Sequence, residues 1–533
     1  MRDGSIRPVR PIRSLRGVLL LAAGLAAAAL AAPAVGTALA GPDAPDPSHA
    51  QDPLRPYTQQ KLHWKRCDPK GPDTLRCATL KVPLDYADPG GRTIGLAISR
   101  LKADSAEERR GVLLLNPGGP GAPGLLLPID PLLRIPAEVR RRYDLVGFDP
   151  RGAGRSTPVN CGLTAEEQAG PPYKAETFTK DVERVRAVAE KCRAAAGATL
   201  PHLTTRNSAR DMDVIRAVLG ERKISYLGIS YGTYLGAVYT QLFPQRADRI
   251  VLDSATDPTR IYRGMFQDMA KAAEHAFTRW TEWTAGRHAT YGLGDTPAEV
   301  RETFRNLIAR ADRTPVVFEG QPLTGDDIRA DNRTFFHLRE AAERIAALKK
   351  AAEDGAPAPS GPPEPAEDPD QSDQAGESDE SDDSDDNYAS VAWSVMCADT
   401  RTWSHDPERY RREAVRDTAR YPLYGDFAAA ITPCAFWQRG SEPQTTIDNG
   451  VGALITQNEW DSQTPLFAGQ AMHRALRGSR MVTVAGGEGH GVLYATDGET
   501  CADRAATDYL TTGRLPAADL TCRAAAGPKP GPE

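Results

Sequence analysis

The sequence predicts an α/β protein whose sheet is mostly parallel and is interrupted by a long helical segment. Two observations support this fold class, and the first is a set of short, continuous apolar runs typical of strands buried on both faces. These runs lie at residues 111–115, 143–148, 223–229 and 249–252. The second is helical text between them, at residues 209–219 and 231–243. Strands that alternate with helices form parallel sheets.

The first two strands are expected to form a hairpin ahead of the parallel strands. Residues 80–82 and 93–99 alternate between apolar and polar side chains, as half-buried strands do. The turn Asp88-Pro89-Gly90-Gly91 separates them. Gly and Pro at this point favour a reversal of the chain.

After Asp257 the pattern becomes helical, and no buried strand is expected until the chain returns to the sheet. The expected helices cover residues 262–283, 297–311 and 326–352, and strand-like text resumes at 451–456 and 480–484. A helical lid is therefore predicted between strands 6 and 7. Residues 355–386 are rich in Pro, Ser, Asp and Glu without apolar periodicity, so we expect that tract to be disordered.

These patterns divide the chain into consecutive parts. The expected parts are a signal peptide at 1–40, a loose leader at 41–60, the first part of the core at 61–258, the lid at 259–390, the second part of the core at 391–525, and a tail at 526–533.

Composition excludes several classes of function. The chain has 533 residues, 40% hydrophobic and 26% charged, which indicates a globular protein. Its formal net charge is −6, and much of the imbalance comes from fourteen Asp or Glu within residues 351–386. No basic field or zinc-finger spacing is present, so we expect no nucleic-acid partner.

The N-terminus has the order of parts found in a secretory signal. Five Arg precede Gly17, an apolar run covers residues 17–34, and Ala38-Leu39-Ala40 supplies small residues at a cleavage site. A membrane anchor is the alternative, but the run is Ala-rich and barely long enough to span. We expect a secreted, extracellular protein without a membrane anchor after cleavage.

Eight cysteines lie beyond the signal, an even number that favours disulfides in an exported chain. Sequence alone does not fix their connectivity. Pairing nearest neighbours gives the simplest expectation: Cys67–Cys77, Cys161–Cys192, Cys397–Cys434 and Cys501–Cys522. No Cys-x-x-Cys occurs, which argues against a metal or redox site.

Gly228-Ile229-Ser230-Tyr231-Gly232 is the one Gly-x-Ser-x-Gly motif in the chain. A predicted strand precedes it and a predicted helix follows it, which is the context of the nucleophile turn in the α/β-hydrolase fold. The serine sits on a sharp turn, where flanking glycines avoid clashes. Ser230 is therefore the expected nucleophile, against the alternative of a buried structural serine.

A serine nucleophile needs a base, and this fold places the histidine last in the chain. His490 follows the strand at 480–484 within a Gly-rich loop that could fold over the sheet edge. His473 lies in helical text and would be fixed on its surface. We therefore expect His490 to be the general base.

The orienting acid is expected after the strand at 451–456, where Asp461 lies. Glu459 is its neighbour and competitor. Asp253 and Asp257 are rivals, because some hydrolases of this fold place the acid after the sixth strand.

Acyl transfer also needs backbone N–H donors for a developing oxyanion. In this fold one donor belongs to the residue after the nucleophile, here Tyr231, and another to the loop after the third strand. That loop is Asn116-Pro117-Gly118-Gly119, so Gly118 or Gly119 is the expected second donor. A phosphate cradle is the rival, but the Lys and Ser/Thr of a phosphate-binding loop are missing.

Taken together, these blocks resemble the secreted tripeptidyl aminopeptidases and proline iminopeptidase-like enzymes of the α/β-hydrolase superfamily, in their actinobacterial exported branch. The matching text comprises residues 80–86, 116–121, 147–156, 228–232 and 249–253, Asp461 with Thr464-Pro465, Gly489-His490-Gly491 and Cys434-Ala435-Phe436-Trp437. The resemblance implies a serine exopeptidase that acts at the free N-terminus of peptides and forms an acyl-enzyme on Ser230.

Two alternatives remain open. A carboxylic ester hydrolase would use the same triad, although the predicted lid is rich in Arg, which favours a polar substrate over a lipid. A non-catalytic binding protein on a hydrolase scaffold is disfavoured by the intact order of Ser, acid and His. We expect a monomer that uses neither a cofactor nor a metal.

Overall fold

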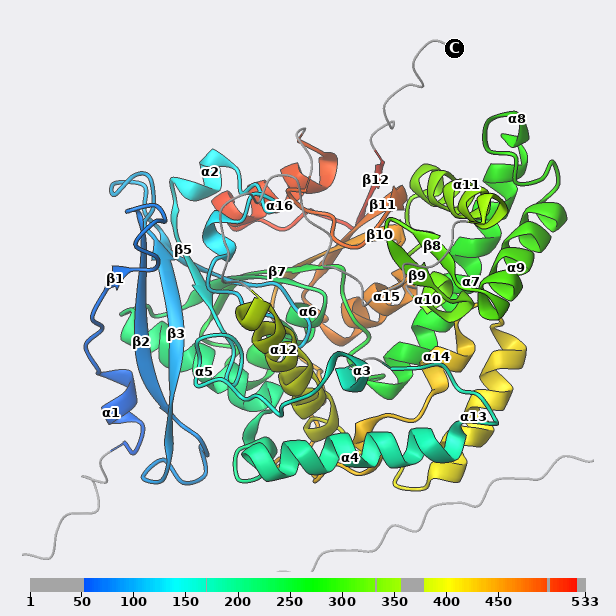
Figure 1. The fold of residues 1–533 in the computed structure, drawn as a ribbon. Helices are drawn as coiled ribbons and strands as arrows, with labels where there is room; N and C mark the ends of the chain where they lie inside the picture. The colour runs from blue at the N-terminus through cyan, green and yellow to red at the C-terminus, as the bar shows by residue number, and fades with distance from the viewer. Residues whose placement is uncertain (1–51, 169, 331–332, 356–377, 496–498, 525–533) are drawn as a thin grey trace, which may run out of the picture. The chain divides into compact units, whose positions relative to one another are not determined.

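The sheet expected from the sequence is present in the computed structural model, which describes residues 52–168, 170–330, 333–355, 378–495 and 499–524. Its ten strands have the order β1-β2-β3-β5-β4-β6-β7-β10-β11-β12 (Figure 1). Strands β1 to β3 are antiparallel and β3 pairs antiparallel with β5, whereas β5 and all strands beyond it are parallel. This is the α/β-hydrolase arrangement that the sequence predicts.

The strands of this sheet are β1 (Lys65–Arg66), β2 (Leu75–Pro83), β3 (Thr93–Leu101), β4 (Gly111–Asn116), β5 (Tyr143–Phe148), β6 (Ile224–Ile229), β7 (Ala247–Asp253), β10 (Ala453–Trp460), β11 (Arg480–Glu488) and β12 (Leu520–Arg523). The helices that accompany it are α1 (Arg55–Thr58), α2 (Ala137–Arg140), α3 (Ala165–Gln168), α4 (Phe178–Ala196), α5 (Thr205–Val218), α6 (Tyr231–Leu242), α15 (Leu466–Ala475) and α16 (Cys501–Thr512).

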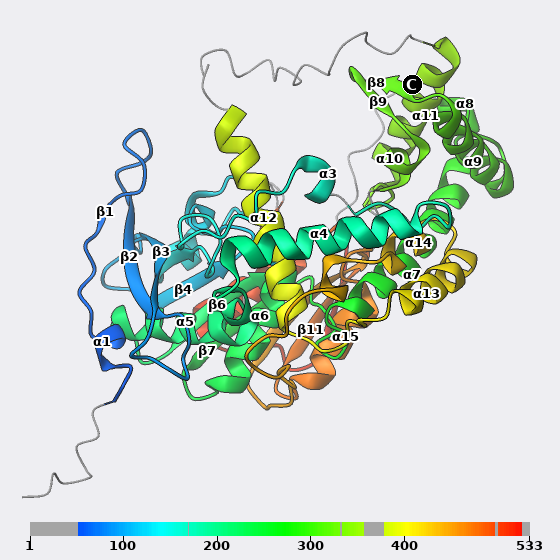
Figure 2. The same cartoon turned by 60° about the horizontal axis from the view of Figure 1, so that its bottom comes forward.

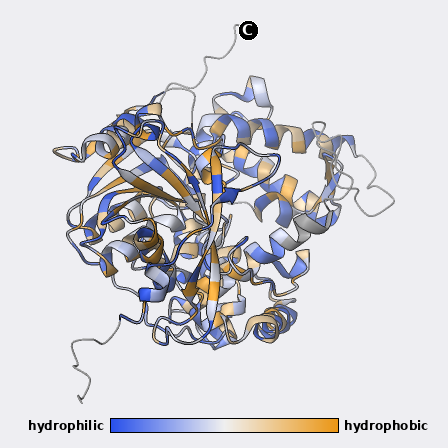
Figure 3. Ribbon diagram, turned by 90° about the vertical axis from the view of Figure 1, so that its left-hand side faces the viewer, coloured by the Kyte–Doolittle hydropathy of each residue, from blue (hydrophilic) through white to orange (hydrophobic). Residues whose placement is uncertain are grey.

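Alternate side chains of the central strands enter two different cores. Val112 and Leu114 of β4 pack in the core that includes α5 and α6, whereas Leu113 and Leu115 pack in the core that includes α2 and α16. All four are fully or almost fully buried. This explains why the strand is a continuous apolar run, and Figure 3 shows apolar colour along the sheet.

The insert between β7 and β10 has a core of its own. Phe277 and Trp280 of α7 pack with Phe304 of α9 and with Phe335, at ring-centroid distances from 4.9 to 6.2 Å. The insert contains α7 (Arg263–Ala285), α8 (His288–Tyr291), α9 (Pro297–Arg313), β8 (Val316–Phe318), β9 (Gln321–Leu323), α10 (Gly325–Ala330), α11 (Leu338–Asp354), α12 (Ser378–Ala398), α13 (Pro407–Arg420), α14 (Gly425–Ala429) and the 3₁₀ turn η4 (Pro433–Ala435).

The insert differs from the prediction in three details. The short hairpin β8–β9 was not expected, because three-residue strands leave too little periodicity to detect. The helix predicted at 326–352 is instead two helices, α10 and α11, because Phe335, which lies between them, packs in the insert's core. The insert also continues past residue 390, because Arg263 of α7 pairs with Glu413 of α13 and bonds to the carbonyls of residues 428–430.

The prediction of disorder at 355–386 is wrong at its C-terminal end. Helix α12, which Figure 2 shows in yellow, already begins at Ser378. The Asp386 carboxylate is buried and accepts hydrogen bonds from the backbone N–H groups of Gly162 and Leu163 at 2.9 Å. This anchoring explains why an acidic sequence is ordered there. Residues 356–377 lie outside the described residues.

The expected loose leader at 41–60 is also wrong where it is described. Tyr57 of α1 is buried, and its hydroxyl donates to the Pro89 carbonyl at 2.5 Å. The Gln60 amide pairs with both the N–H and the C=O of Lys81 in β2. The predicted signal peptide and tail lie outside the described residues. Within the described ranges, no helix combines the length and apolarity needed to cross a bilayer.

All eight cysteines form disulfides, and the nearest-neighbour pairing is confirmed. The bonds are Cys67–Cys77, Cys161–Cys192, Cys397–Cys434 and Cys501–Cys522. Each closes a loop of between 10 and 37 residues. One of them, Cys397–Cys434, joins α12 to η4 inside the insert.

Candidate active site

Ser230 lies on a tight turn between β6 and α6, with φ 59° and ψ −124°. This left-handed conformation is uncommon for a residue with a side chain. A Cβ on Gly228 would lie 2.5 Å from Gly232 O, and one on Gly232 would lie 2.8 Å from Asn116 Oδ1, so both positions require glycine. The turn is fixed by the Ser230 N–H, which donates to Asp253 O at 3.0 Å.

The turn presents the Ser230 side chain to a cavity rather than to the core. Among the described residues, the Ser230 hydroxyl has no hydrogen-bond partner. A hydroxyl in this position is available to a ligand in the cavity.

His490 and Asp461 meet as the sequence predicts. His490 Nδ1 lies 2.8 Å from Asp461 Oδ2. The carboxylate is itself held by the Gln463 and Thr464 N–H groups at 2.8 and 3.0 Å and by the Thr464 hydroxyl at 2.7 Å. A carboxylate accepts only, so the proton of the neutral imidazole belongs on Nδ1 and Nε2 is left as the basic nitrogen.

The environment of His490 favours its protonated form. Burial lowers the pKa of the imidazole, but the Asp461 carboxylate, by charge and hydrogen bond, and the Asp253 charge outweigh it. The net result is a pKa raised above 6.5. An imidazole of this kind accepts a proton more readily than one without a carboxylate partner.

The rival acids have other partners. Asp253 is fully buried and accepts from the backbone N–H groups of Val492 and Leu493 and from the Thr456 hydroxyl. Asp257 accepts hydrogen bonds from the Thr259 N–H and hydroxyl, and Glu459 accepts one from the Gly486 N–H. The structure therefore brings Asp461, and none of these three, to His490 Nδ1.

His473, the alternative base, lies away from this arrangement. Its Nδ1 is 2.6 Å from the Ser479 hydroxyl, and its Nε2 is 3.2 Å from Asp519. These contacts tie α15 to the loops around it.

Three side chains, Asn458, Asp253 and Ser254, hold the His490 loop in roles that the sequence does not predict. The Asn458 amide donates to the carbonyls of Glu488, Gly489 and Gly491 at 3.0 to 3.1 Å. Asp253 binds the other side of the loop, and the Gly491 N–H donates to Ser254 Oγ at 2.9 Å. Because Ser230 N–H is bonded to Asp253 O, the serine turn and the histidine loop share one anchor at 253–254. No sequence motif marks Asn458 or Asp253 for this role.

The two candidate oxyanion donors after β4 are not equivalent. The Gly118 N–H is already used, because it donates to Asn116 Oδ1 at 3.1 Å. Gly119 lines the cavity together with Ser230 and Tyr231, whereas Gly118 packs against the turn. The Tyr231 N–H lies at the first position of α6, where helical N–H groups have no helical partner. This geometry favours Gly119 and Tyr231.

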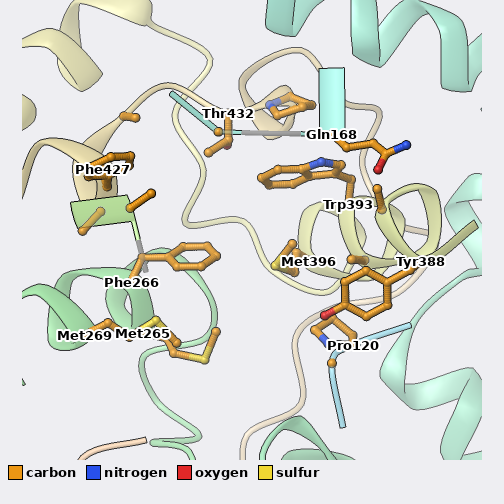
Figure 4. Close-up of a pocket in the computed structure, with 18 of the residues that line it drawn as sticks. Pro120, Gln168, Met265, Phe266, Met269, Tyr388, Trp393, Met396, Phe427 and Thr432 are labelled. Atoms are coloured by element: carbon orange, nitrogen blue, oxygen red, sulfur yellow. The ribbon is translucent and has the colours of Figure 1, made fainter. Parts of the chain in front are cut away.

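The cavity at Ser230 has a volume of about 760 Å³, within the range of binding pockets. The insert forms most of its wall (Figure 4). In Figure 4, Met265, Phe266 and Met269 of α7 lie on one side with Phe427 of α14, and face side chains of α12. The charged side chains among the lining residues are Glu167, Arg184 and Asp385.

No group of three or more His, Cys, Asp or Glu with the spacing of a metal site occurs among the residues that the structure describes.

Comparison with known proteins agrees with the architecture. Residues 111–314 match the family model described as "alpha/beta hydrolase fold", and residues 421–522 match the one described as "TAP-like protein". The chain is 35% identical over 502 residues to a tripeptidyl aminopeptidase of Streptomyces lividans, covering 88% of each chain.

Two mycobacterial proteins are also similar to the chain. It is 29% identical to the serine protease Hip1 of Mycobacterium tuberculosis over 493 residues, which is 88% of this chain and 92% of that protein. It is also 29% identical to carboxylesterase B of the same organism over 501 residues, with 90% and 93% covered.

Proposed function

The chain belongs to the tripeptidyl aminopeptidase family and is a serine hydrolase of the aminopeptidase type, and from this premise we propose that it releases short N-terminal peptides, tripeptides among them, from exported or extracellular peptides. The single observation that carries the proposal is the insert-covered cavity at Ser230. A cavity of bounded size accommodates a short acyl segment, whereas the leaving peptide can be of any length.

The proposed chemistry gives the three side chains the roles of a Ser-His-Asp triad. Ser230 Oγ attacks the scissile carbonyl carbon while His490 Nε2 takes its proton, and Asp461 stabilises the imidazolium. The Tyr231 and Gly119 N–H groups stabilise the oxyanion of the tetrahedral intermediate. His490 then gives the proton to the leaving amine, which departs and leaves an acyl-enzyme on Ser230. Water, activated by His490, hydrolyses this ester and restores the free serine.

Recognition of a free N-terminus requires a negative group on the cavity wall. Glu167 is paired with Lys191 at 2.6 Å, so its charge is already compensated. Asp385 of α12 also lines the cavity and has no ion-pair partner among the described residues. We therefore assign the substrate ammonium to Asp385.

Acetylation of the substrate N-terminus tests this proposal. We expect Asp385→Asn to lower kcat/KM on a free-amine tripeptidyl substrate by about tenfold to a hundredfold, the value of a charge-assisted contact. It should leave the rate on the acetylated peptide unchanged. Glu302→Gln, an exposed carboxylate of the insert outside the cavity, is the matched control and should change neither rate. Equal rates of the unmodified enzyme on free and acetylated peptides would contradict an exopeptidase.

An ester hydrolase remains the second candidate, because one relative is named as a carboxylesterase. The same triad cleaves esters, so the ratio of kcat/KM on a tripeptidyl amide and on a short acyl ester separates the two candidates. A preference for the ester together with no cleavage of free-amine peptides would favour the second.

Export is proposed on two observations. The four disulfides are typical of proteins that fold outside a reducing cytoplasm, and the N-terminal sequence has the pattern of a secretory signal. N-terminal sequencing of the protein recovered from culture medium tests it, with cleavage expected after Ala40.

A further inference from the structure

Large, adaptable apolar side chains form much of the cavity wall. Beyond Met265, Phe266 and Met269 of α7, the helix α12 contributes Trp393 and Met396. Methionine side chains adjust their shape to a ligand, and aromatic rings offer flat apolar contact. Three methionines and two aromatic rings from α7 and α12 therefore face one space and can adapt to the shape of a ligand.

The charged groups of the cavity are few and come from other elements. Glu167 belongs to α3, Arg184 to α4 and Asp385 to the first half of α12. None comes from α7, whose side of the cavity is formed by Met265, Phe266 and Met269. A charged substrate side chain placed there would lose its hydration without gaining a partner.

We propose that this wall selects peptides with large apolar side chains, such as Phe, Leu or Met, in the segment that becomes the acyl group. The inference rests on the proposed function, since it concerns the short N-terminal segment that the cavity would hold. Shape tolerance is expected along with apolar selectivity, because methionines line the space.

A panel of tripeptidyl aminocoumarins with free N-termini tests the substrate class. Each position in turn carries Phe, Leu, Met, Ala, Asp or Lys. At one position or more, kcat/KM should be at least about tenfold higher for Phe, Leu and Met than for Ala. At the same position, Asp and Lys should fall below Ala.

Variants of the wall connect the preference to the structure. Trp393→Ala should reduce the Phe-to-Ala ratio, and Met269→Lys should raise the rate on the Asp-bearing peptide relative to the Lys-bearing one. Trp283→Ala, on α7 but not among the residues that line the cavity, is the matched control and should leave every ratio unchanged. Titration of active serines with a fluorophosphonate corrects each rate for folded enzyme.

Two failures can be told apart. Cleavage of all peptides at equal kcat/KM would overturn the apolar selectivity and leave the exopeptidase standing. No cleavage of any free-amine peptide, with esters still cleaved, would overturn the proposed function and with it this inference.

A second, independent observation concerns a buried carboxylate behind the nucleophile turn. Asp399 follows α12 and is almost fully buried. Its Oδ1 accepts from the Thr205 N–H at 2.7 Å, and its Oδ2 accepts from the Thr205 hydroxyl and from the Tyr262 hydroxyl, the latter at 2.9 Å. Burial raises the pKa of Asp399 to about 6.

The Thr205 hydroxyl is also hydrogen-bonded to the Tyr231 hydroxyl, so one hydrogen-bond chain runs from Asp399 through Thr205 to Tyr231. The two hydroxyl oxygens are 2.7 Å apart, and because Thr205 donates to Asp399, the Tyr231 phenol donates to Thr205. Tyr231 is the residue whose backbone N–H is assigned to the oxyanion. We infer that Asp399 is a positioning residue, which fixes the Tyr231 side chain and thereby the direction of its N–H.

A double-mutant cycle tests the inference. Tyr231→Phe and Asp399→Asn should each lower kcat per titrated serine on a short ester by about tenfold, because an oxyanion donor is misaligned. KM should change little. The double variant should be no slower than the slower single variant, since both break one chain.

Several outcomes would overturn it. Additive losses in the double variant would mean that the two residues act separately. An unchanged kcat per titrated serine with a lowered Tm would mean that Asp399 is structural only. Thr205→Ser, which keeps the hydroxyl, should retain the rate, whereas Thr205→Val should not. Equal rates in these two variants would also contradict the inference.

Discussion

At the scale of single residues, the Ser230 hydroxyl is the proposed nucleophile and contributes little to packing. Ser230→Ala should lower kcat by about 10⁴- to 10⁶-fold, the usual cost of removing a triad member. Thermal unfolding should be unchanged, because the hydroxyl has no hydrogen-bond partner among the described residues. A well-folded Ser230→Ala enzyme with more than a tenth of the original rate would refute the assignment of the nucleophile.

The two histidines provide a matched pair for the base. His490→Ala should be as inactive as the serine variant, whereas His473→Ala should keep its rate and lose only the contacts to Ser479 and Asp519. Inactivity of the His473 variant alone would reverse the assignment.

The raised pKa of His490 predicts the acid side of the pH profile. The base acts only when neutral, so kcat/KM should rise with pH through an apparent pKa above 6.5. In Asp461→Asn the carboxylate that raises the pKa is gone, so this limb should move to lower pH, with kcat reduced about 10⁴-fold. An uncharged ester is the right substrate, because a peptide amine titrates in the same range. A limb that does not move in Asp461→Asn would contradict the pairing.

How far the site could be predicted differs from residue to residue. Ser230, His490 and Asp461 follow from the order of motifs, because each sits at a strand end where the fold needs it. Asp399 could not be found, since its role depends on Thr205 and Tyr231, which are distant in sequence. The choice of Gly119 over Gly118 also needed the structure, because only the structure shows that the Gly118 N–H already donates a hydrogen bond to Asn116 Oδ1.

At the scale of elements, the insert contacts the histidine loop at the Glu488 carboxylate. Arg279 of α7 contacts Glu488 at 2.6 Å, and Glu488 lies two residues before His490. His337, just before α11, adds a 3.6 Å contact to the same carboxylate. Through these contacts the insert supports the loop as well as covering the cavity.

Arg279→Gln tests this support. We expect a modest loss of kcat, about threefold to tenfold, because a partly buried ion pair is worth about 1 kcal/mol and the loop keeps its Asn458 and Asp253 anchors. Amide exchange of residues 488–491 should become faster. Arg301→Gln, which breaks the contact with Glu274 inside the insert, is the control. Equal effects of the two variants would show that the ion pair does not act on the loop.

Elements with continuous apolar runs were predictable, and elements shaped by tertiary contacts were not. The strands β4 to β7 match the sequence because two-sided burial leaves an unbroken pattern. The start of α12 was not predicted, because its acidic residues favour disorder by themselves. The helix is anchored by hydrogen bonds from the N–H groups of Gly162 and Leu163 to the Asp386 carboxylate. The break between α10 and α11 likewise reflects the packing of Phe335 with Phe277 and Trp280.

At the scale of the whole molecule, one disulfide joins two walls of the cavity. Cys397 comes directly after Met396, and Cys434 comes directly after Thr432 and Pro433. Met396, Thr432 and Pro433 all line the cavity. Replacing both cysteines by Ser should lower stability by about 2 to 4 kcal/mol and raise KM more than it lowers kcat. Removing Cys67–Cys77 in the same way is the control, because that bridge lies at the hairpin edge of the sheet. Similar KM changes in both variants would contradict a special role for the first bridge.

Placing this bridge beside the substrate has a consequence for the cell that makes the protein. In a reducing cytosol the cysteines stay as thiols, so α12 and η4 lack their covalent link and this part of the cavity wall is held by packing alone. A cell that exports the chain would therefore hold it, before oxidation, in a form that binds peptides less tightly. Dithiothreitol should raise the KM of the purified enzyme, as replacement of Cys397 and Cys434 should, and reoxidation should reverse the change.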